Sequence, residues 1–326
     1  MVSNQINSVN IFYPVQDQLL RVEALMRKQA DERHPDLTAA LNHLLSSGGK
    51  RVRPAVVLLT GGMLGGDRDL LVTLAAAVEL LHTATLVHDD LIDGAFLRRG
   101  IATLNSRWSP AATVLTGDFI FSRAAKLAAD TKSVELMRLF AETLTTIVNG
   151  EIKQLFSSRS LVDRAEYDLR IYAKTASLFE LSTSAAAMLS PVDTAVVDKA
   201  RRFGYLIGMA FQLVDDILDF TGQEATLGKP VASDLRQGIF TLPALYYCES
   251  HSDDPTLVMI QKGDRVPEEA IIGLVDAIRE SGAIRRATGD AERYIEQGLE
   301  TLSCFPDGVE RQALEELSRY LMRREM

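Results

Sequence analysis

The sequence contains little cysteine and few aromatic residues. Only two cysteines, Cys248 and Cys304, occur among 326 residues, and they lie far apart in the chain. Two isolated cysteines indicate neither a disulfide framework nor a zinc site, so we expect a reducing compartment, the cytoplasm. Aromatic residues make up 6% of the chain, whereas hydrophobic residues make up 47% and include many Leu and Ala. This composition favours helices over sheets.

The chain also lacks a linker and an excess of basic residues. No Pro-, Gly- or Ser-rich segment divides it, so residues 1–326 are expected to form one large helical domain. The net charge is -9 at pH 7. Because phosphate backbones attract basic surfaces, this charge argues against nucleic acid as a partner.

Long uninterrupted hydrophobic runs are missing as well. The apolar stretch from Leu70 to Leu81 is broken by Glu79 and followed by His82. We judge such stretches too short to cross a bilayer and expect no stable membrane insertion. The first residues, MVSNQIN, have neither a basic n-region nor an apolar h-region, so no secretory leader is expected.

Against this composition, an aspartate cluster follows one long apolar segment. Asp89, Asp90 and Asp93 close a run that contains no Gly or Pro from Leu70 onwards. The run predicts a long, largely buried helix that carries the acids at its C-terminal end. Helical geometry places Asp89 and Asp93 one turn apart on nearly the same face. Carboxylates this close require a cation.

A second cluster repeats the spacing on another apolar helix. Asp215, Asp216 and Asp219 end the segment FQLVDDILD at 211–219. A lone cluster of this kind is usually a solvated acidic patch. Two copies within apolar helices would cost several kcal/mol per uncompensated charge, which favours a functional explanation. Because Mg²⁺ binds through one or two carboxylates plus substrate phosphates, the pair predicts a Mg²⁺-diphosphate site, provided that both clusters face one cavity.

Five motifs occur in a fixed order along the chain. They are GGKRVRP at 48–54, DDLID at 89–93 with RRG at 98–100, Lys174-Thr175, FQLVDDILD at 211–219 and GKP at 228–230. In this order the chain resembles the trans-isoprenyl diphosphate synthases, also called polyprenyl synthetases, over nearly its whole length. The resemblance implies an all-α fold, a single large helical bundle with a central cavity of the isoprenoid synthase type, and a homodimer.

The resemblance also implies a reaction and its metal. The expected activity is Mg²⁺-dependent head-to-tail prenyl transfer, in which isopentenyl diphosphate condenses with an allylic diphosphate. Asp89, Asp93 and Asp215 are the expected metal ligands, with about three Mg²⁺ ions per active site. Asp90 joins the catalytic candidates as a member of the first motif.

Basic residues near the first motif are expected to bind the two diphosphates. The resemblance assigns Lys50, Arg53 and His82 to isopentenyl diphosphate, Arg98 to the allylic diphosphate and Arg99 to isopentenyl diphosphate. Arg offers phosphate bidentate donors, and Lys offers a point charge. On its own, a basic turn is more often solvated, and a lone histidine is more often a core residue. A simpler role, in which Arg98 and Arg99 only neutralise the carboxylates, stays open.

The apolar segment around Lys174 predicts a buried cation. A buried lysine requires a partner, and the resemblance provides one in the allylic diphosphate. It also places the oxygens of Thr175 and Gln212 against the developing carbocation. Glu151 and Gln154 match a GExxQ element of the family and are expected to contact the residues of the site and not the substrate itself.

Lys229 follows a turn-rich segment at 222–228 and matches a diphosphate-binding lysine of the family. The next motif departs from the pattern. Many members continue with Gly-Lys-x-Thr-x-Pro, whereas this chain reads GIFTLP at 238–243, with Ile239 in place of the lysine. One auxiliary diphosphate cation is therefore absent.

The residues before the first motif are expected to determine product length. Counted back from that motif at 1.5 Å per residue, Ala84 lies about 7.5 Å deep and Leu81 about 12 Å deep. In short-chain relatives a bulky aromatic residue at the position of Ala84 or Thr85 stops growth, and here both are small. We therefore expect a product of roughly six or more isoprene units, a precursor of a quinone side chain. The candidate floor residues are Leu81, Met137 and Phe140.

Three alternatives remain open from the sequence. A shorter product would make the enzyme a geranylgeranyl or farnesyl diphosphate synthase. A terpene cyclase shares the helical architecture, but its second metal motif is usually an Asn/Ser/Glu pattern. A non-catalytic subunit of a heteromeric synthase usually lacks the paired acid clusters that this chain contains.

Overall fold

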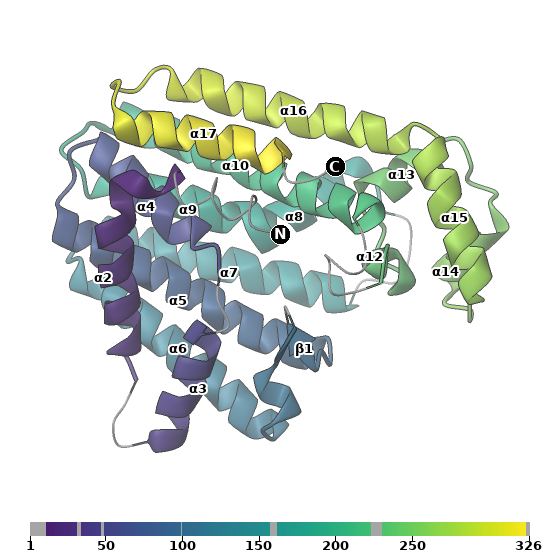
Figure 1. Cartoon of the computed structure of the whole chain (residues 1–326), viewed down its shortest axis with the longest axis horizontal. Helices are drawn as coiled ribbons and strands as arrows, with labels where there is room; N and C mark the ends of the chain where they lie inside the picture. The colour runs from purple at the N-terminus through teal and green to yellow at the C-terminus, as the bar shows by residue number, and fades with distance from the viewer. Residues whose placement is uncertain are drawn as a thin grey trace. The chain divides into compact units, whose positions relative to one another are not determined.

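The computed structural model describes residues 11–30, 34–46, 49–98, 100–156, 162–222 and 230–323, and nearly all of them are helical (Figure 1). Within these ranges the one sheet is an antiparallel hairpin, in which β1 (Leu97–Arg98) pairs with β2 (Ile101–Ala102). Gly100, with φ +77°, occupies the turn in a conformation that glycine adopts without steric cost. The expected all-α class is confirmed.

The chain divides into two compact units. The first unit contains the described residues of Met1–Thr143, Leu178–Gly204 and Leu302–Leu317. The second contains those of Leu144–Ser177, Tyr205–Thr301 and Ser318–Met326. The expectation of a single domain over residues 1–326 stays a prediction.

The first unit is organised around α5 (Arg68–Ile92), which packs against α2 (Gln16–Arg27), α4 (Val52–Met63) and α6 (Pro110–Asp130). Asp67 caps its N-terminus, because the Asp67 carboxylate accepts hydrogen bonds from the N–H groups of Asp69 and Leu70 at 2.9 Å each. The other elements that begin in this unit are η1 (Tyr13–Val15), α2 (Gln16–Arg27), α3 (Pro35–Ser46), α4 (Val52–Met63), η2 (Leu104–Ser106), α6 (Pro110–Asp130), α7 (Val134–Phe156), α10 (Thr194–Thr221) and α17 (Val309–Arg323).

Helix α5 corrects one sequence argument. With 25 residues and a mean hydropathy of 1.9 over its most apolar window, it is long and apolar enough to span a bilayer. The expectation that apolar stretches are too short was wrong, because Glu79 and His82 do not interrupt the helix. Of that window, 67% is buried inside the protein. Burial against α2, α4 and α6 accounts for this apolar character, as in the core helix of a globular domain.

A close helix crossing fixes the end of α5. A Cβ atom on Gly117 of α6 would lie 2.1 Å from Nε2 of His88 on α5, so a larger residue at this position would displace the imidazole. The imidazole of His88 also lies 3.2 Å from the carbonyl oxygen of Val114 and packs against the Phe121 ring at 5.4 Å. These contacts hold the last turns of α5 against α6.

The second unit surrounds the C-terminal part of α10. Its elements are α8 (Arg164–Ile171), the π-helical turn η3 (Tyr172–Ala176), α12 (Ser233–Arg236), α13 (Leu242–Cys248), α14 (Pro255–Lys262), α15 (Glu268–Glu280) and most of α16 (Ala283–Leu302), and α9 (Ser177–Met188) follows η3 along the chain. Its core gathers fully buried side chains from α8, α10 and the segment before α13, among them Tyr167, Leu213, Phe220 and Phe240.

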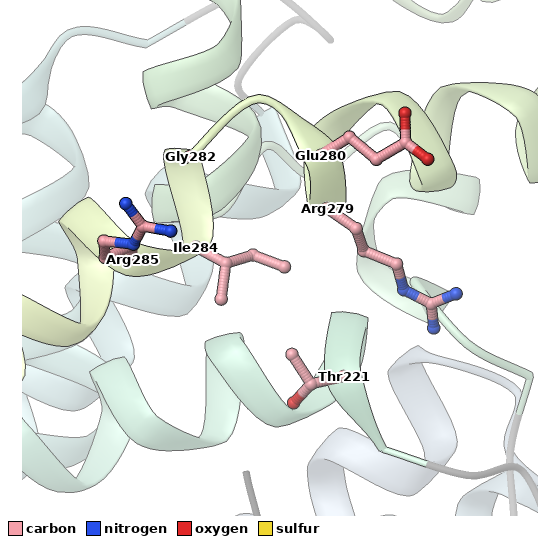
Figure 2. A pocket seen from close by; sticks show the side chains of 6 residues that line it. All are labelled: Thr221, Arg279, Glu280, Gly282, Ile284 and Arg285. Carbon is pink, nitrogen blue, oxygen red and sulfur yellow. The ribbon is translucent and has the colours of Figure 1, made fainter.

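A pocket of about 430 Å³ opens beside the C-terminus of α10 (Figure 2). Its lining residues are Thr221, Arg279, Glu280, Gly282, Ile284 and Arg285. The guanidinium of Arg279 donates from Nε and Nη2 to the carbonyl oxygen of Phe220, at 2.8 and 2.6 Å. This contact satisfies a carbonyl at the end of the helix, so Arg279 holds the terminus of α10.

Candidate active site

The first aspartate motif lies at the C-terminal end of α5. Asp89 and Asp90 belong to the last turn, and Asp93 is the C-cap residue. Asp93 is exposed and Asp89 is half-buried, whereas Asp90 is only 6% exposed. The predicted helix and the predicted position of the acids at its end are both present.

Four half-buried side chains near this helix end form one stripe. His82, Thr85, Leu86 and Asp89 are half-buried, whereas Ala84 and its neighbours Thr83 and Val87 are buried. The spacing i, i+3, i+4, i+7 places these half-buried residues on one helical face. That face runs from the histidine expected to contact isopentenyl diphosphate to the first metal candidate.

Asp90 is held by hydrogen bonds to neighbouring residues of the fold. Its carboxylate accepts a hydrogen bond from Nε of Arg98 at 2.8 Å, and its carbonyl oxygen accepts bonds from Ala95 and Asn105 at 2.9 and 3.2 Å. Burial raises the pKa of Asp90, and the charge of Arg98 opposes that rise. The neutralising role considered for Arg98 is therefore present, while its contact with the allylic diphosphate stays a prediction. Arg99 lies outside the described residues.

Two of the predicted diphosphate contacts lie together in the first unit. Nη1 of Arg53 is 3.1 Å from Nε2 of His82, and the Arg53 guanidinium lies over the Phe179 ring at 5.0 Å. Because a guanidinium can only donate, Arg53 is the donor in this contact and Nε2 of His82 is the acceptor. Lys50 is exposed and lies two residues before α4 begins. All three expected contacts therefore border the same end of α4.

Arg51 was not singled out from the sequence. Its backbone is left-handed, with φ +47°, and its side chain turns inward. The guanidinium donates to the carboxylates of Glu79 at 2.8 Å and Glu23 at 3.2 Å, and to the carbonyl oxygen of Leu45 at 3.1 Å. The sequence signal for this contact was Glu79, because an acid within an apolar helix indicates a cationic partner such as Arg51. The ion pair fixes the turn that carries Lys50.

In the second motif, two of the three aspartates are buried. Asp216 and Asp219 are 3% and 2% exposed, whereas Asp215 is half-buried. The Asp219 carboxylate accepts hydrogen bonds from the Ser233 hydroxyl at 3.0 Å and from the N–H of Asp234 at 3.3 Å. Asp219 therefore secures the start of α12.

Asp216 is held by two donors. The Tyr167 hydroxyl and Nε2 of Gln212 each donate to its carboxylate at 2.7 Å. Burial, together with the charge of Asp234, raises the pKa of Asp216 to about 7, and the two hydrogen bonds oppose that rise. No sequence signal indicated Tyr167, because its role depends on a contact between α8 and α10.

Lys174 and Thr175 lie in the π-helical turn η3. The prediction of a buried Lys174 was wrong, since its side chain is 39% exposed and its Nζ lies 3.0 Å from Oε1 of Glu151. The wider turn places the neighbours Ala173 and Thr175 inside and leaves the lysine outside. Single π-turns within helices are frequent at functional sites. The Thr175 hydroxyl donates to Oε1 of Gln212 at 2.6 Å, so this predicted pair is brought together.

Three further predictions concern the second unit. Lys229 lies outside the described residues, and Gln154 is half-buried. Ile239 is half-buried, and its N–H donates to the carbonyl oxygen of Asp234 at 2.9 Å. The consequence of Ile239 for diphosphate binding stays a prediction.

The donor set fits Mg²⁺ that binds together with a substrate. Among the described residues, no three His, Cys, Asp or Glu side chains form a ready-made metal cage. Mg²⁺ does not need such a cage, because substrate phosphates and water complete its coordination. Asp89, Asp93 and Asp215 are the motif carboxylates with substantial accessible surface, and they are the three expected ligands.

The residues expected to determine product length belong to the first unit. Ala84 and Leu81 are fully buried and Phe140 is 2% exposed, while Thr85 and Met137 are half-buried. The Thr85 hydroxyl donates to the carbonyl oxygen of His82 at 2.8 Å, which turns it along its own helix. Their effect on product length stays a prediction.

Comparison with known proteins decides the family. The family model described as polyprenyl synthetase matches residues 34–272, which is most of the chain. The protein belongs to the polyprenyl synthetase family. As a polyprenyl synthetase it is a trans-prenyltransferase that acts on isoprenyl diphosphates with a divalent metal ion.

Relatives and solved structures of polyprenyl synthetases match over nearly the whole chain. Solanesyl-diphosphate synthase 2, chloroplastic, from Oryza sativa subsp. japonica is 34% identical over 333 residues, covering 99% of this chain and 81% of that protein. Heptaprenyl diphosphate synthase component 2 from Geobacillus stearothermophilus is 35% identical over 311 residues, covering 95% and 96%. The structure of polyprenyl synthase from Caulobacter crescentus CB15, complexed with calcium and isoprenyl diphosphate, has a TM-score of 0.92 at 34% identity, with 98% of each chain covered.

Proposed function

We propose that the protein condenses isopentenyl diphosphate with an allylic diphosphate in a Mg²⁺-dependent, head-to-tail reaction. The product is an all-trans polyprenyl diphosphate of roughly six or more isoprene units. One observation carries the proposal: in each aspartate motif, the accessible carboxylates are the expected Mg²⁺ ligands, while the second aspartate is buried in hydrogen bonds. Each motif therefore keeps at least one accessible carboxylate that can bind a metal ion, in addition to the aspartate that stabilises the fold.

The residues divide the reaction between them. Asp89, Asp93 and Asp215 would hold Mg²⁺, about three ions in all, which would supply positive charge to the leaving diphosphate. Lys174 and Arg98 bind that diphosphate as its charge grows. Preorganised charges of this kind stabilise a transition state without reorganising during the reaction.

The second substrate binds through the other basic groups. Lys50, Arg53 and His82 hold isopentenyl diphosphate, and Arg99 adds a contact. Nη1 of Arg53 lies 3.1 Å from Nε2 of His82, so the two side chains are close enough to bind the same diphosphate. The isopentenyl double bond then attacks the allylic carbon, and the departed diphosphate accepts the proton that is lost.

Product length is the finer part of the proposal. The small side chains of Ala84 and Thr85 support a long product, as do relatives named solanesyl and heptaprenyl diphosphate synthase. A quinone side chain is the use that such a product would have. Structural relatives named geranylgeranyl pyrophosphate synthase, at 29% identity, support the shorter product as a second candidate.

The deciding experiment is product sizing. Purified protein is incubated with farnesyl diphosphate, labelled isopentenyl diphosphate and Mg²⁺, and the dephosphorylated products are separated by chromatography. A ladder that ends at roughly six or more units supports the proposal, whereas a single product of about four units selects the shorter alternative. Absence of incorporation contradicts the catalytic role.

Assembly and location complete the proposal. We infer a homodimer from the resemblance, and the relatives named "component 2" introduce a heteromeric synthase as the competing assembly. Light scattering on the pure, active protein tests this: activity of a dimer without a second polypeptide supports the homodimer, and activity that appears only after a partner is added contradicts it. The free thiols of Cys248 and Cys304 support a reducing, cytoplasmic location.

A further inference from the structure

Four polar side chains of the second unit form a continuous chain of hydrogen bonds. The Tyr167 hydroxyl donates to Oδ2 of Asp216, and Nε2 of Gln212 donates to Oδ1, each at 2.7 Å. The Thr175 hydroxyl donates to Oε1 of Gln212 at 2.6 Å. Tyr167, Asp216 and Thr175 are 0%, 3% and 6% exposed, and Gln212 is half-buried. Water therefore cannot readily replace these partners.

The chemistry of Asp216 fixes the direction of every bond in this network. Both oxygens of Asp216 accept a hydrogen bond, Oδ2 from the Tyr167 hydroxyl and Oδ1 from Nε2 of Gln212, so Gln212 turns its NH₂ group toward Asp216. Its carbonyl oxygen then faces Thr175, which must donate its hydroxyl proton to it. The lone pairs of the Thr175 oxygen are left to point away from Gln212. The Asp216 carboxylate, which does not need to contact the substrate, thus determines which atoms of Gln212 and Thr175 donate hydrogen bonds and which accept them.

We propose that Asp216 and Tyr167 are positioning residues that orient Gln212 and Thr175 so that their oxygens face the allylic cation. This inference rests on the proposed function, in which those two oxygens lie against the developing positive charge. An oxygen whose proton is donated elsewhere presents its lone pairs to a cation. Such fixed dipoles act strongly where water is excluded.

Tyr167 contributes by occupying the second carboxylate oxygen. Its burial beside Asp216 raises the pKa of the Tyr167 hydroxyl well above its ordinary value, so the proton stays available for donation. With Oδ2 engaged, Oδ1 is left for Gln212. Tyr167 therefore fixes the rotation of the carboxylate, as Asp216 fixes the rotation of the amide.

A reciprocal exchange of amide and carboxylate tests the proposal. Asp216→Asn turns an NH₂ group toward Gln212, so Gln212 rotates and its own NH₂ group faces Thr175. Gln212→Glu places two carboxylates face to face. The double variant Gln212→Glu/Asp216→Asn restores acceptors toward Thr175 with the same total charge and nearly the same volume.

Activity gives the first readout. Each single variant should lower kcat by about 10- to 100-fold, with KM for both diphosphates changed by less than about three-fold. The double variant should recover kcat to within about three-fold of the wild type. Asp168→Asn, the same exchange at an aspartate that pairs with Arg164 outside the network, should leave kcat unchanged. Full activity of Asp216→Asn, or a double variant no more active than either single variant, would overturn the proposal.

Thermal unfolding without substrate gives a second readout that is independent of activity. The Tm changes of the two single variants should not add: the double variant should have a Tm about 2–4 °C higher than the sum of the single changes predicts, because the two side chains interact directly. Tyr167→Phe should lower Tm by about 2–4 °C and reduce kcat without raising KM. Tm changes that add in the double variant would refute the network. Absence of wild-type turnover would refute the proposed function instead, and the unfolding cycle would still decide on the network.

Discussion

The buried carboxyl of Asp216 should make the free energy of unfolding decrease as the pH rises from about 4 to 7. Its pKa is about 7 in the folded protein, against an ordinary value of 3.8. Between these values the folded state keeps a proton that the unfolded state has released. A raised folded pKa therefore contributes stability below about pH 4, and that contribution is lost as the pH rises toward 7. The total loss is roughly 4 kcal/mol, or about 1.4 kcal/mol per pH unit.

The assay is denaturant unfolding of the wild type and Asp216→Asn from pH 4.5 to 8, with a chelator present to remove divalent metal. The wild-type free energy of unfolding should decrease with pH more steeply than that of the variant, by about 1 kcal/mol per pH unit between pH 5 and 6. Asp198→Asn, at an exposed position of the same helix, controls for the loss of one carboxyl group. Parallel pH dependences in the wild type and Asp216→Asn would refute the reasoning.

Three further predictions follow from the first unit. Asp89→Ala should lower kcat by several orders of magnitude and leave the circular dichroism spectrum intact, and turnover near the wild-type value would contradict metal binding at this residue. Ala84→Phe should shorten the product to about three or four isoprene units in the sizing assay, and an unchanged product would refute the depth estimate. Glu79→Ala leaves the half-buried Arg51 guanidinium without its shortest ion pair and should lower the free energy of unfolding by about 2–3 kcal/mol, whereas Glu23→Ala should cost about 1 kcal/mol or less. Equal losses in denaturant unfolding of these two variants would contradict the assignment.

The periodicity of the sequence was sufficient to predict the helices that carry the motifs. The run before Asp89 lacks Gly and Pro and forms α5, and the segment before Asp215 forms the end of α10. Both predictions depend on local patterns, which survive folding when they are long and strongly apolar. The order of the motifs then led to the family, which the comparison confirmed.

The individual roles within the motifs depend on contacts that spacing does not encode. Nothing in the repeat of Asp-Asp-x-x-Asp distinguishes Asp90 and Asp216, which are buried, from their accessible neighbours. Tertiary partners make that distinction: Arg98 for the first and Tyr167 for the second. Lys174 was expected inside because its neighbours are apolar, but a π-turn changed the helical register at that point.

The most direct test is a crystal structure with Mn²⁺ and a non-cleavable allylic diphosphate analogue, in which anomalous scattering locates the metal. We predict that Asp89, Asp93 and Asp215 are ligands of the bound metal ions and that Asp90 and Asp216 are uncoordinated. Metal bound at one motif alone, or coordinated by Asp90 or Asp216, would contradict this prediction.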